Sequence, residues 1–260
     1  MRIKANGITF NYTIDGPEGA PWVVFSNSLA TTMAMWDEQA AVLKSKYRVL
    51  LYDQRGHGAT DAPAGRYAFD TLVADAAALL DALGIKTAWF GGLSMGGATS
   101  LGLALQHPDK VNGIMICDHA CKSTPASSQQ WEERIVMAQT KGMEALVEPT
   151  IGRWFPPEIL AKNPPYIDTV RGMIRNTPVN GFIGCSAALA DHDYNSKVET
   201  VKCPVLFMVG EKDGTAPAAM KDMHARLKGS RYVELAGAGH ISNLDRSAEF
   251  TKAIQEFVAS

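Results

Sequence analysis

The pentapeptide Gly-Leu-Ser-Met-Gly at residues 92–96 places Ser94 between two glycines, a pattern suited to nucleophilic chemistry. An apolar run (88–90) precedes it, and a helix-forming run (98–105) follows it. A serine on such a strand-to-helix turn needs small neighbours, because the turn is strained and its backbone approaches adjacent segments closely. The pattern therefore predicts that Ser94 is a nucleophile, and the alternative is an ordinary glycine-rich turn.

A serine hydroxyl is a poor nucleophile at neutral pH, so Ser94 requires a general base and an acid that orients this base. Among six histidines, His240 stands in a glycine-rich loop after the last predicted strand, and the alternative is a surface histidine. Asp213 follows an apolar strand-like run, and Glu211 is its main rival. We predict that His240 is the base and that Asp213 fixes its tautomer.

Attack on a carbonyl carbon leaves a negatively charged oxygen that needs N–H donors. The helix after Ser94 directs its unpaired N–H groups and positive dipole end toward this oxygen, so the Met95 N–H is one predicted donor. In such sites the second donor comes from the loop after an early strand. Residues 23–25 lead directly into Ser26-Asn27-Ser28-Leu29, so we predict Leu29 as the second donor.

The other histidines and the four cysteines suggest mainly structural roles. His57 lies in Arg-Gly-His-Gly at residues 55–58 and is expected to be structural. His119 and His192 lack a comparable setting, but both could face a pocket. The cysteines form no Cys-x-x-Cys pair and lack zinc-site spacing, so we expect buried, reduced thiols. No metal or organic cofactor is implied.

The elements that must position these residues alternate between short apolar runs and longer helix-like segments. Strands are predicted at 8–14, 22–26, 48–52, 87–91, 111–117, 205–209 and 231–235. Helices are predicted at 71–83, 96–107 and 248–258. This alternation is typical of an α/β fold, with a mostly parallel sheet covered by helices on both faces. We assign residues 1–120 and 196–260 to this core.

The segment 121–195 departs from that rhythm and contains no convincing strand. Prolines punctuate it, and helices are predicted at 131–140, 142–147, 164–176 and 179–190. A helical insertion between two halves of an α/β core is typical of a cap, or lid, over an active site. We therefore predict that residues 121–195 form a helical cap.

Composition limits the classes of partner. Hydrophobic residues make up 46% and charged residues 20% of the 260 residues, as in ordinary globular proteins. The net charge of -2 favours neither nucleic acid nor an anionic membrane as a partner. The first residues lack the apolar region of a signal peptide, and no apolar stretch reaches a membrane-spanning length. We expect a cytoplasmic protein that acts on a small molecule; its oligomeric state is not indicated.

The chain order Ser94, Asp213, His240 is that of the α/β-hydrolase fold. Three further segments, 26–29, 153–155 and 239–243, make the chain resemble the 3-oxoadipate enol-lactonases of the β-ketoadipate pathway. The similarity extends from the N-terminal strands through the cap to the last helix. It implies hydrolysis of a small carboxylated enol-lactone to 3-oxoadipate in bacterial aromatic catabolism.

A carboxylated substrate requires a cation near the pocket, preferably an arginine for bidentate binding. The cap contains four arginines, at positions 134, 153, 171 and 175. Arg153 and Trp154 match the family's cap motif and are predicted to face the substrate, with Arg134 as a weaker candidate. Asn27 and Ser28 are predicted to add polar contacts. The alternative for each arginine is a surface ion pair.

Other functions are compatible with the same residues. A broad-range carboxylesterase would use the same serine, acid and base. The α/β-hydrolase fold also serves as a ligand receptor with slow turnover, although an intact triad argues against a catalytically dead protein. Dehalogenase and epoxide hydrolase chemistry would require an aspartate where Ser94 stands and is disfavoured.

Overall fold

The computed structural model describes residues 1–260, and its eight strands form one sheet in the order β1-β2-β4-β3-β5-β6-β7-β8. The strands are β1 (Arg2–Ala5), β2 (Ile8–Asp15), β3 (Trp22–Ser26), β4 (Arg48–Tyr52), β5 (Ala88–Leu93), β6 (Val111–Cys117), β7 (Val205–Gly210) and β8 (Arg231–Leu235). β1 and β2 pair antiparallel, and all pairs from β4 onward in this order are parallel. The predicted, mostly parallel sheet is confirmed.

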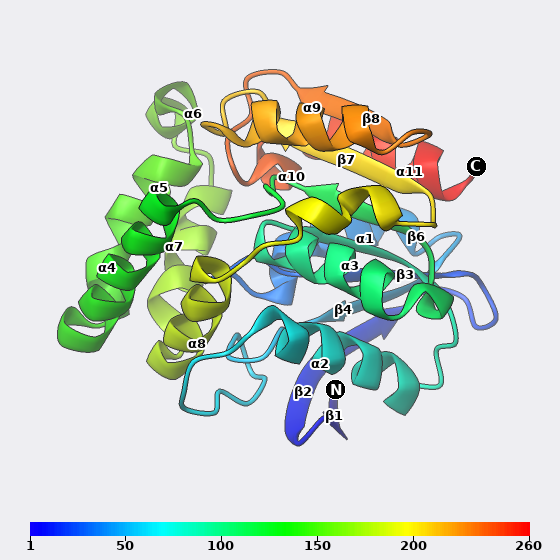
Figure 1. The fold of residues 1–260 in the computed structure, drawn as a ribbon, viewed down its shortest axis with the longest axis horizontal. Coiled ribbons are helices and arrows are strands. Elements are labelled where there is room, and N and C mark those ends of the chain that lie inside the picture. The colour runs from blue at the N-terminus through cyan, green and yellow to red at the C-terminus, as the bar shows by residue number, and fades with distance from the viewer.

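Helices cover both faces of the sheet (Figure 1). They are α1 (Asp37–Leu43), α2 (Phe69–Ala82), α3 (Met95–Gln106), α9 (Ala216–Arg226), the short α10 (Ser242–Asp245) and α11 (Ser247–Val258). Helix α2 packs on α3 across one face, and α1 packs on α11 across the other. Between β3 and this second pair, Trp36 stacks on Phe25 at 4.6 Å and contacts Phe250 at 5.9 Å. Burial of these aromatic faces holds the layers together.

The predicted strands and core helices are all present, and four core elements, β1, α1, α9 and the four-residue α10, were not predicted. β1 is only four residues long and carries two charged side chains, so its sequence shows little strand character. α1 has seven residues, and α9 buries only Met220 and Met223. Such short or polar elements owe their structure to tertiary packing more than to sequence period.

Residues 121–195, the predicted cap, contain five α-helices, one more than predicted, and no strand. These are α4 (Pro125–Lys141), α5 (Val147–Trp154), α6 (Pro157–Lys162), α7 (Tyr166–Asn176) and α8 (Val179–Ala190). They gather on one side of the molecule, where α4 packs along α8 (Figure 1). An isolated bridge between Lys122 and Asp193 joins the two ends of the insertion. None of the helices combines the length and the apolar composition needed to cross a membrane.

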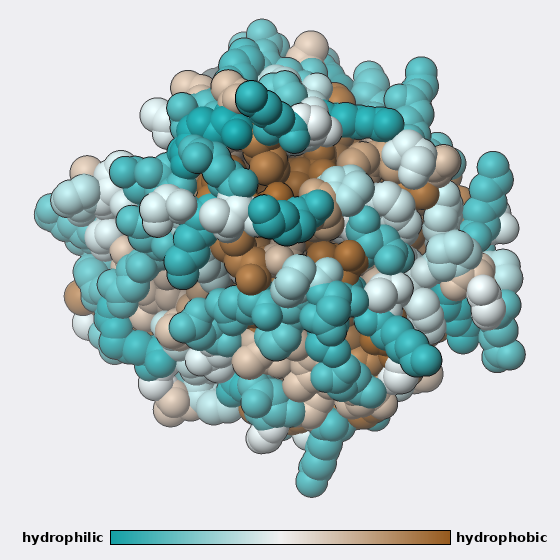
Figure 2. Space-filling view, turned by 45° about the vertical axis from the view of Figure 1, so that its right-hand side comes forward, coloured by the Kyte–Doolittle hydropathy of each residue, from teal (hydrophilic) through white to brown (hydrophobic).

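The surface is mainly hydrophilic, as expected from the composition of an ordinary globular protein. The face in Figure 2 is mainly hydrophilic, and apolar residues gather in a depression near its centre. Beneath the surface, one cluster of 72 buried hydrophobic residues spans both the sheet layers and the cap helices. Because this core is continuous, the cap packs firmly on the sheet domain instead of hanging from it by linkers.

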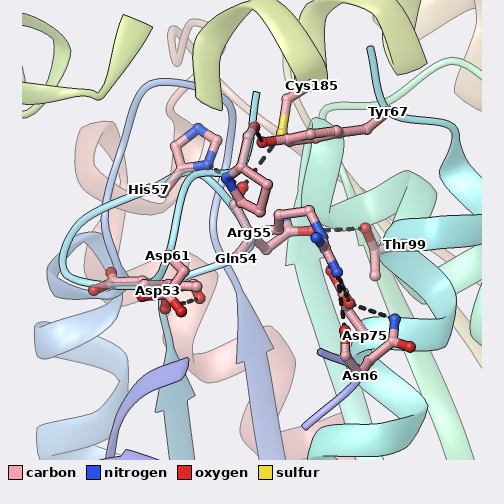
Figure 3. A network of polar contacts seen from close by, with 12 residues as sticks. Asn6, Asp53, Gln54, Arg55, His57, Asp61, Tyr67, Asp75, Thr99 and Cys185 are labelled. Carbon is pink, nitrogen blue, oxygen red and sulfur yellow. Dashed lines mark hydrogen bonds and ion pairs between the residues drawn. The ribbon is translucent and has the colours of Figure 1, made fainter. Parts of the chain in front are cut away.

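The turn after β4 ties the cap to the sheet (Figure 3). Arg55 donates two hydrogen bonds to Asp75 of α2, at 2.6 and 2.7 Å, and both side chains are largely buried. Next to it, Gly56 (φ +80°) packs directly against Gly181 of α8, and a Cβ atom on either glycine would collide with the other backbone. The Cys185 thiol of α8 donates to the Arg55 carbonyl oxygen. This turn is therefore a junction between sheet, α2 and cap.

We expect Arg55→Met to destabilise the protein by about 3–5 kcal/mol, because Asp75 would remain buried without its partner. The matched control is Arg66→Met, which removes an exposed ion pair with Glu132 and should cost less than about 1 kcal/mol. Urea unfolding of the two variants measures this difference. Equal losses would mean that the Arg55 pair contributes no more than a surface pair.

Candidate active site

Ser94 occupies a strained turn between β5 and α3, with φ 57° and ψ -112°. Its N–H donates to the Cys117 carbonyl oxygen of β6 at 2.7 Å, which anchors the turn. A Cβ atom on Gly92 would collide with the Gly96 backbone, and one on Gly96 would collide with the Ser26 carbonyl oxygen. The two motif glycines are thus required by space, and the strained turn presents the serine at the cavity.

His240 and Asp213 meet as predicted. Nδ1 of His240 lies 2.9 Å from Oδ2 of Asp213, and both side chains are largely buried. The rival Glu211 is used elsewhere, because its carboxylate accepts a hydrogen bond from the Gly237 N–H at 2.7 Å. This geometry leaves Nε2 of His240 free to accept a proton. Ser94 lines the same cavity without a hydrogen bond to His240, and such bonds often tighten only when substrate binds.

The cap fixes the position of His240. Its N–H donates to the Trp154 carbonyl oxygen at 2.8 Å, and the Trp154 ring stacks on the imidazole at 5.8 Å and 28°. Gly239 also packs so closely on the Trp154 carbonyl that a Cβ atom would collide with it. Trp154 lines the cavity as well. It therefore has a structural role, as the support of His240, that the sequence did not reveal.

The two predicted oxyanion donors are both unused. Leu29 and Met95 are buried, and neither N–H donates a hydrogen bond within the protein. Met95 is the first residue of α3, so its N–H has no acceptor in the helix. The close contact between Gly96 and the Ser26 carbonyl brings this helix start to the loop that carries Leu29. Unused, buried donors at a nucleophile are what a developing oxyanion requires.

Asn27 and Ser28 are fully buried and lie outside the cavity lining. The Asn27 amide donates to the carbonyl oxygens of Ser28 and Thr31, and its own carbonyl accepts from the Gln54 N–H at 2.8 Å. With its donors and acceptor engaged in the protein, Asn27 shapes the loop. The structure thus does not bring either residue to the cavity for the predicted substrate contacts.

His57 supports the loop that carries Asn27 and Leu29. Its Nε2 accepts a hydrogen bond from the Ala30 N–H at 2.9 Å, and Nδ1 lies 3.1 Å from the Arg55 carbonyl oxygen (Figure 3). Ala30 has a positive φ of 59°, so its conformation needs this support. Burial lowers the pKa of His57 to about 4, which keeps the ring a neutral acceptor. The expected structural role fits this geometry.

A cavity of about 620 Å³ is lined by Ser94, Asp213 and His240. Trp131 of α4 and Arg153 of α5 also line it. The guanidinium of Arg153 lies 5.4 Å from the centre of the Trp131 ring. Trp131 was not predicted, because a tryptophan at helical spacing usually indicates a core position. The one available signal was its place three residues before Arg134 on the same cap helix.

The cap arginines divide into two classes. Arg171 pairs with Glu148 and Asp168, and Arg175 pairs with Glu144, so both form surface ion pairs. Arg153, by contrast, makes no ion pair and faces the cavity. Arg171 and Arg175 therefore form the surface ion pairs of the predicted alternative, whereas Arg153 does not.

The environment of Arg153 lacks a compensating acid in contact. The Arg153 side chain is exposed to solvent and lines the cavity. Burial, and then the charge of Arg134, lower the pKa of Arg153 to about 9, so it stays cationic at neutral pH. Arg134 itself lies 4.7 Å from the Trp131 ring and borders a separate pocket of about 200 Å³. The structure therefore places Arg153, and not Arg134, in the cavity of Ser94.

Comparison with known proteins agrees with this architecture. Residues 21–247 match the alpha/beta hydrolase fold family. 3-Oxoadipate enol-lactonase 1 of Acinetobacter baylyi is 33% identical over 100% of this chain and 97% of its own length. Enol-lactonase 2 of that organism is 32% identical over 97% of this chain and 94% of its own length.

Among solved structures, the enol-lactonase of Burkholderia xenovorans LB400 is 36% identical, covers 100% of both chains and gives a TM-score of 0.96. Fold, full-length coverage and identity thus agree across independent comparisons. The chain belongs to the α/β-hydrolase fold family and, within it, to the 3-oxoadipate enol-lactonase family of ester-hydrolysing enzymes.

Proposed function

We propose that the protein hydrolyses a small enol-lactone that carries a carboxylate, with 3-oxoadipate enol-lactone as the substrate and 3-oxoadipate as the product. The observation that carries this proposal is Arg153, a cation without an acidic partner in the cavity of Ser94. Arginine binds carboxylates bidentately, and such charge-assisted hydrogen bonds are strong. The names of the relatives support the same substrate, and with it a role in aromatic catabolism.

In the proposed first half-reaction, His240 takes the Ser94 proton as Oγ attacks the lactone carbonyl carbon. The N–H groups of Leu29 and Met95 hold the oxyanion, and Asp213 stabilises the imidazolium. The ring C–O bond then breaks, and its electron pair leaves with the enol oxygen, which receives the proton from His240. The acyl group stays on Ser94 while the enol remains attached to it through the chain.

In the second half-reaction, His240 removes a proton from water, and the hydroxide attacks the acyl carbon. The ester bond to Oγ breaks, His240 returns its proton to Ser94, and the free acid leaves. The enol converts to the more stable ketone, which makes the hydrolysis effectively irreversible. Throughout both half-reactions Arg153 binds the free carboxylate of the substrate, the one that is not part of the lactone ring. It thereby sets the orientation of the lactone relative to Ser94.

We expect Ser94→Ala to lower kcat for 3-oxoadipate enol-lactone by ~10⁴-fold or more, because the attacking oxygen is removed. The variant should also lose labelling by a fluorophosphonate probe. The control is Ser100→Ala, which changes a buried serine of α3 whose hydroxyl donates to the Gly96 carbonyl oxygen; labelling should persist. A wild type that reacts with no probe and no ester would indicate a ligand receptor instead of a hydrolase.

We expect Arg153→Gln to raise KM for the carboxylated lactone by about 10- to 100-fold, the size of a lost charge-assisted hydrogen bond. Hydrolysis of neutral p-nitrophenyl butyrate should be almost unchanged. Arg175→Gln is the matched control, because Arg175 is already paired with Glu144 on the surface. Equal effects on both substrates would refute carboxylate binding, and cleavage of the neutral ester alone would indicate a carboxylesterase.

A further inference from the structure

A buried carboxyl group, that of Asp245, lies beside the loop of the catalytic base and has no part in the proposed mechanism. Asp245 is the last residue of α10, which follows His240 in the chain, and only 8% of it is exposed. Its Oδ2 accepts a hydrogen bond from the Gly239 N–H at 2.7 Å, and its Oδ1 accepts one from the Tyr166 hydroxyl at 3.0 Å. One oxygen is thus engaged by the residue before His240, and the other by the cap.

Tyr166 connects Asp245 to the cap helices. It is the first residue of α7, and its ring lies 6.0 Å from the ring of Phe155, which directly follows α5. The residue before Phe155 is Trp154, whose carbonyl oxygen accepts the His240 N–H at 2.8 Å. The cap therefore reaches the base loop at two neighbouring points: α5 by a direct backbone hydrogen bond, and α7 through Asp245.

These contacts hold two consecutive N–H groups of the base loop. Gly239 donates to Asp245, and His240 donates to Trp154. Glycine restricts its backbone less than other residues do, so this loop needs contacts from outside to keep one conformation. The imidazole turns about its side-chain bonds, but the position of its backbone decides how far Nε2 reaches toward Ser94. In such a geometry, a displacement of about 1 Å can lower a rate by ~100-fold.

The chemistry of Asp245 argues for more than attachment of the cap. Burial raises the pKa of its carboxyl group, and the hydrogen bonds from Gly239 and Tyr166 oppose this shift only in part. A buried carboxyl group is costly unless its oxygens are hydrogen-bonded, and apolar side chains would attach the cap at less cost. A carboxyl group does what apolar side chains cannot: it accepts one hydrogen bond from the backbone of the base loop and another from the cap.

We propose that Asp245 and Tyr166 are positioning residues that set the place of His240 from the cap side. The inference rests on the proposed hydrolysis, but not on the identity of the substrate. Neither residue lines the cavity, so their loss should lower kcat and leave KM nearly unchanged. Because Arg153 directly precedes Trp154 in α5, the helix that carries the proposed carboxylate-binding cation also holds the base.

The test measures hydrolysis of p-nitrophenyl butyrate and the rate of labelling by a fluorophosphonate probe. Asp245→Leu removes both hydrogen bonds and should lower kcat and the labelling rate by about 30- to 100-fold, with KM changed by less than ~3-fold. Tyr166→Phe removes one hydroxyl and should lower both rates by about 3- to 10-fold. Asp245→Asn still offers an oxygen to the Gly239 N–H and a polar group to Tyr166, and it should recover most of the loss.

A double variant distinguishes one shared path from two independent effects. Because Tyr166 acts through Asp245, Tyr166→Phe combined with Asp245→Leu should be no slower than Asp245→Leu alone. The matched control is Tyr232→Phe, which removes a hydroxyl that donates to Glu234 on the surface and should behave as the wild type. Thermal unfolding shows whether each variant is folded. If Asp245→Leu does not fold, the changes of kcat and KM in Tyr166→Phe decide the outcome.

No loss of kcat, a rise in KM alone, additive losses in the double variant, or an Asn variant no better than Leu would overturn the proposal. Each variant is also assayed with 3-oxoadipate enol-lactone. If the wild type cleaves the ester but not the lactone, and the variants behave as expected, the proposed substrate is wrong and the positioning role stands. A wild type that reacts with neither the probe nor the ester refutes the hydrolase, and this inference with it.

Discussion

The contact between Gly96 and the Ser26 carbonyl oxygen is the constraint on which the site depends. It is possible only because Gly96 lacks a Cβ atom, and it brings the start of α3 to the end of β3. The nucleophile and both predicted oxyanion donors belong to these two segments. The backbone conformation of Ser94 is strained, at a cost of about 1–3 kcal/mol. The hydrogen bond to Cys117 and the packing of Gly96 hold the turn in this conformation.

The loops that carry Asp213 and His240 form a second structural unit of the site. The Lys212 N–H donates to the Ala238 carbonyl oxygen, so the two loops are joined by their backbones as well as by Asp213 and His240. Asp118, at the end of β6, accepts from the Gly210 N–H and bonds the Ser242 hydroxyl, which adds a third anchor. Since Trp154 also supports His240, the cap contributes to the geometry of the base in addition to covering the cavity.

Each member of the proposed triad has a local signature in the sequence: a glycine-flanked serine, an aspartate after an apolar strand and a histidine in a glycine loop. Side-chain direction has no such signature. Asn27 is polar and lies two residues before the predicted oxyanion donor Leu29 in the sequence, yet its side-chain amide donates to carbonyl oxygens of its own loop. The pairing of His119 with His192 joins positions 73 residues apart and depends on how α8 returns to the core. Such contacts follow from tertiary packing, which no sequence period encodes.

The polar groups that line the cavity differ in charge. Arg153 is exposed to solvent, lines the cavity and has no acid in contact, so no carboxylate of the protein neutralises its charge. A substrate carboxylate would supply that missing partner. His119 and His192 do not compete for this carboxylate, because burial lowers the pKa of both rings and keeps them uncharged at neutral pH. Ser94, Arg153, His119 and His192 all line this one cavity, which therefore offers a short substrate a cation and neutral hydrogen-bonding groups together with the serine.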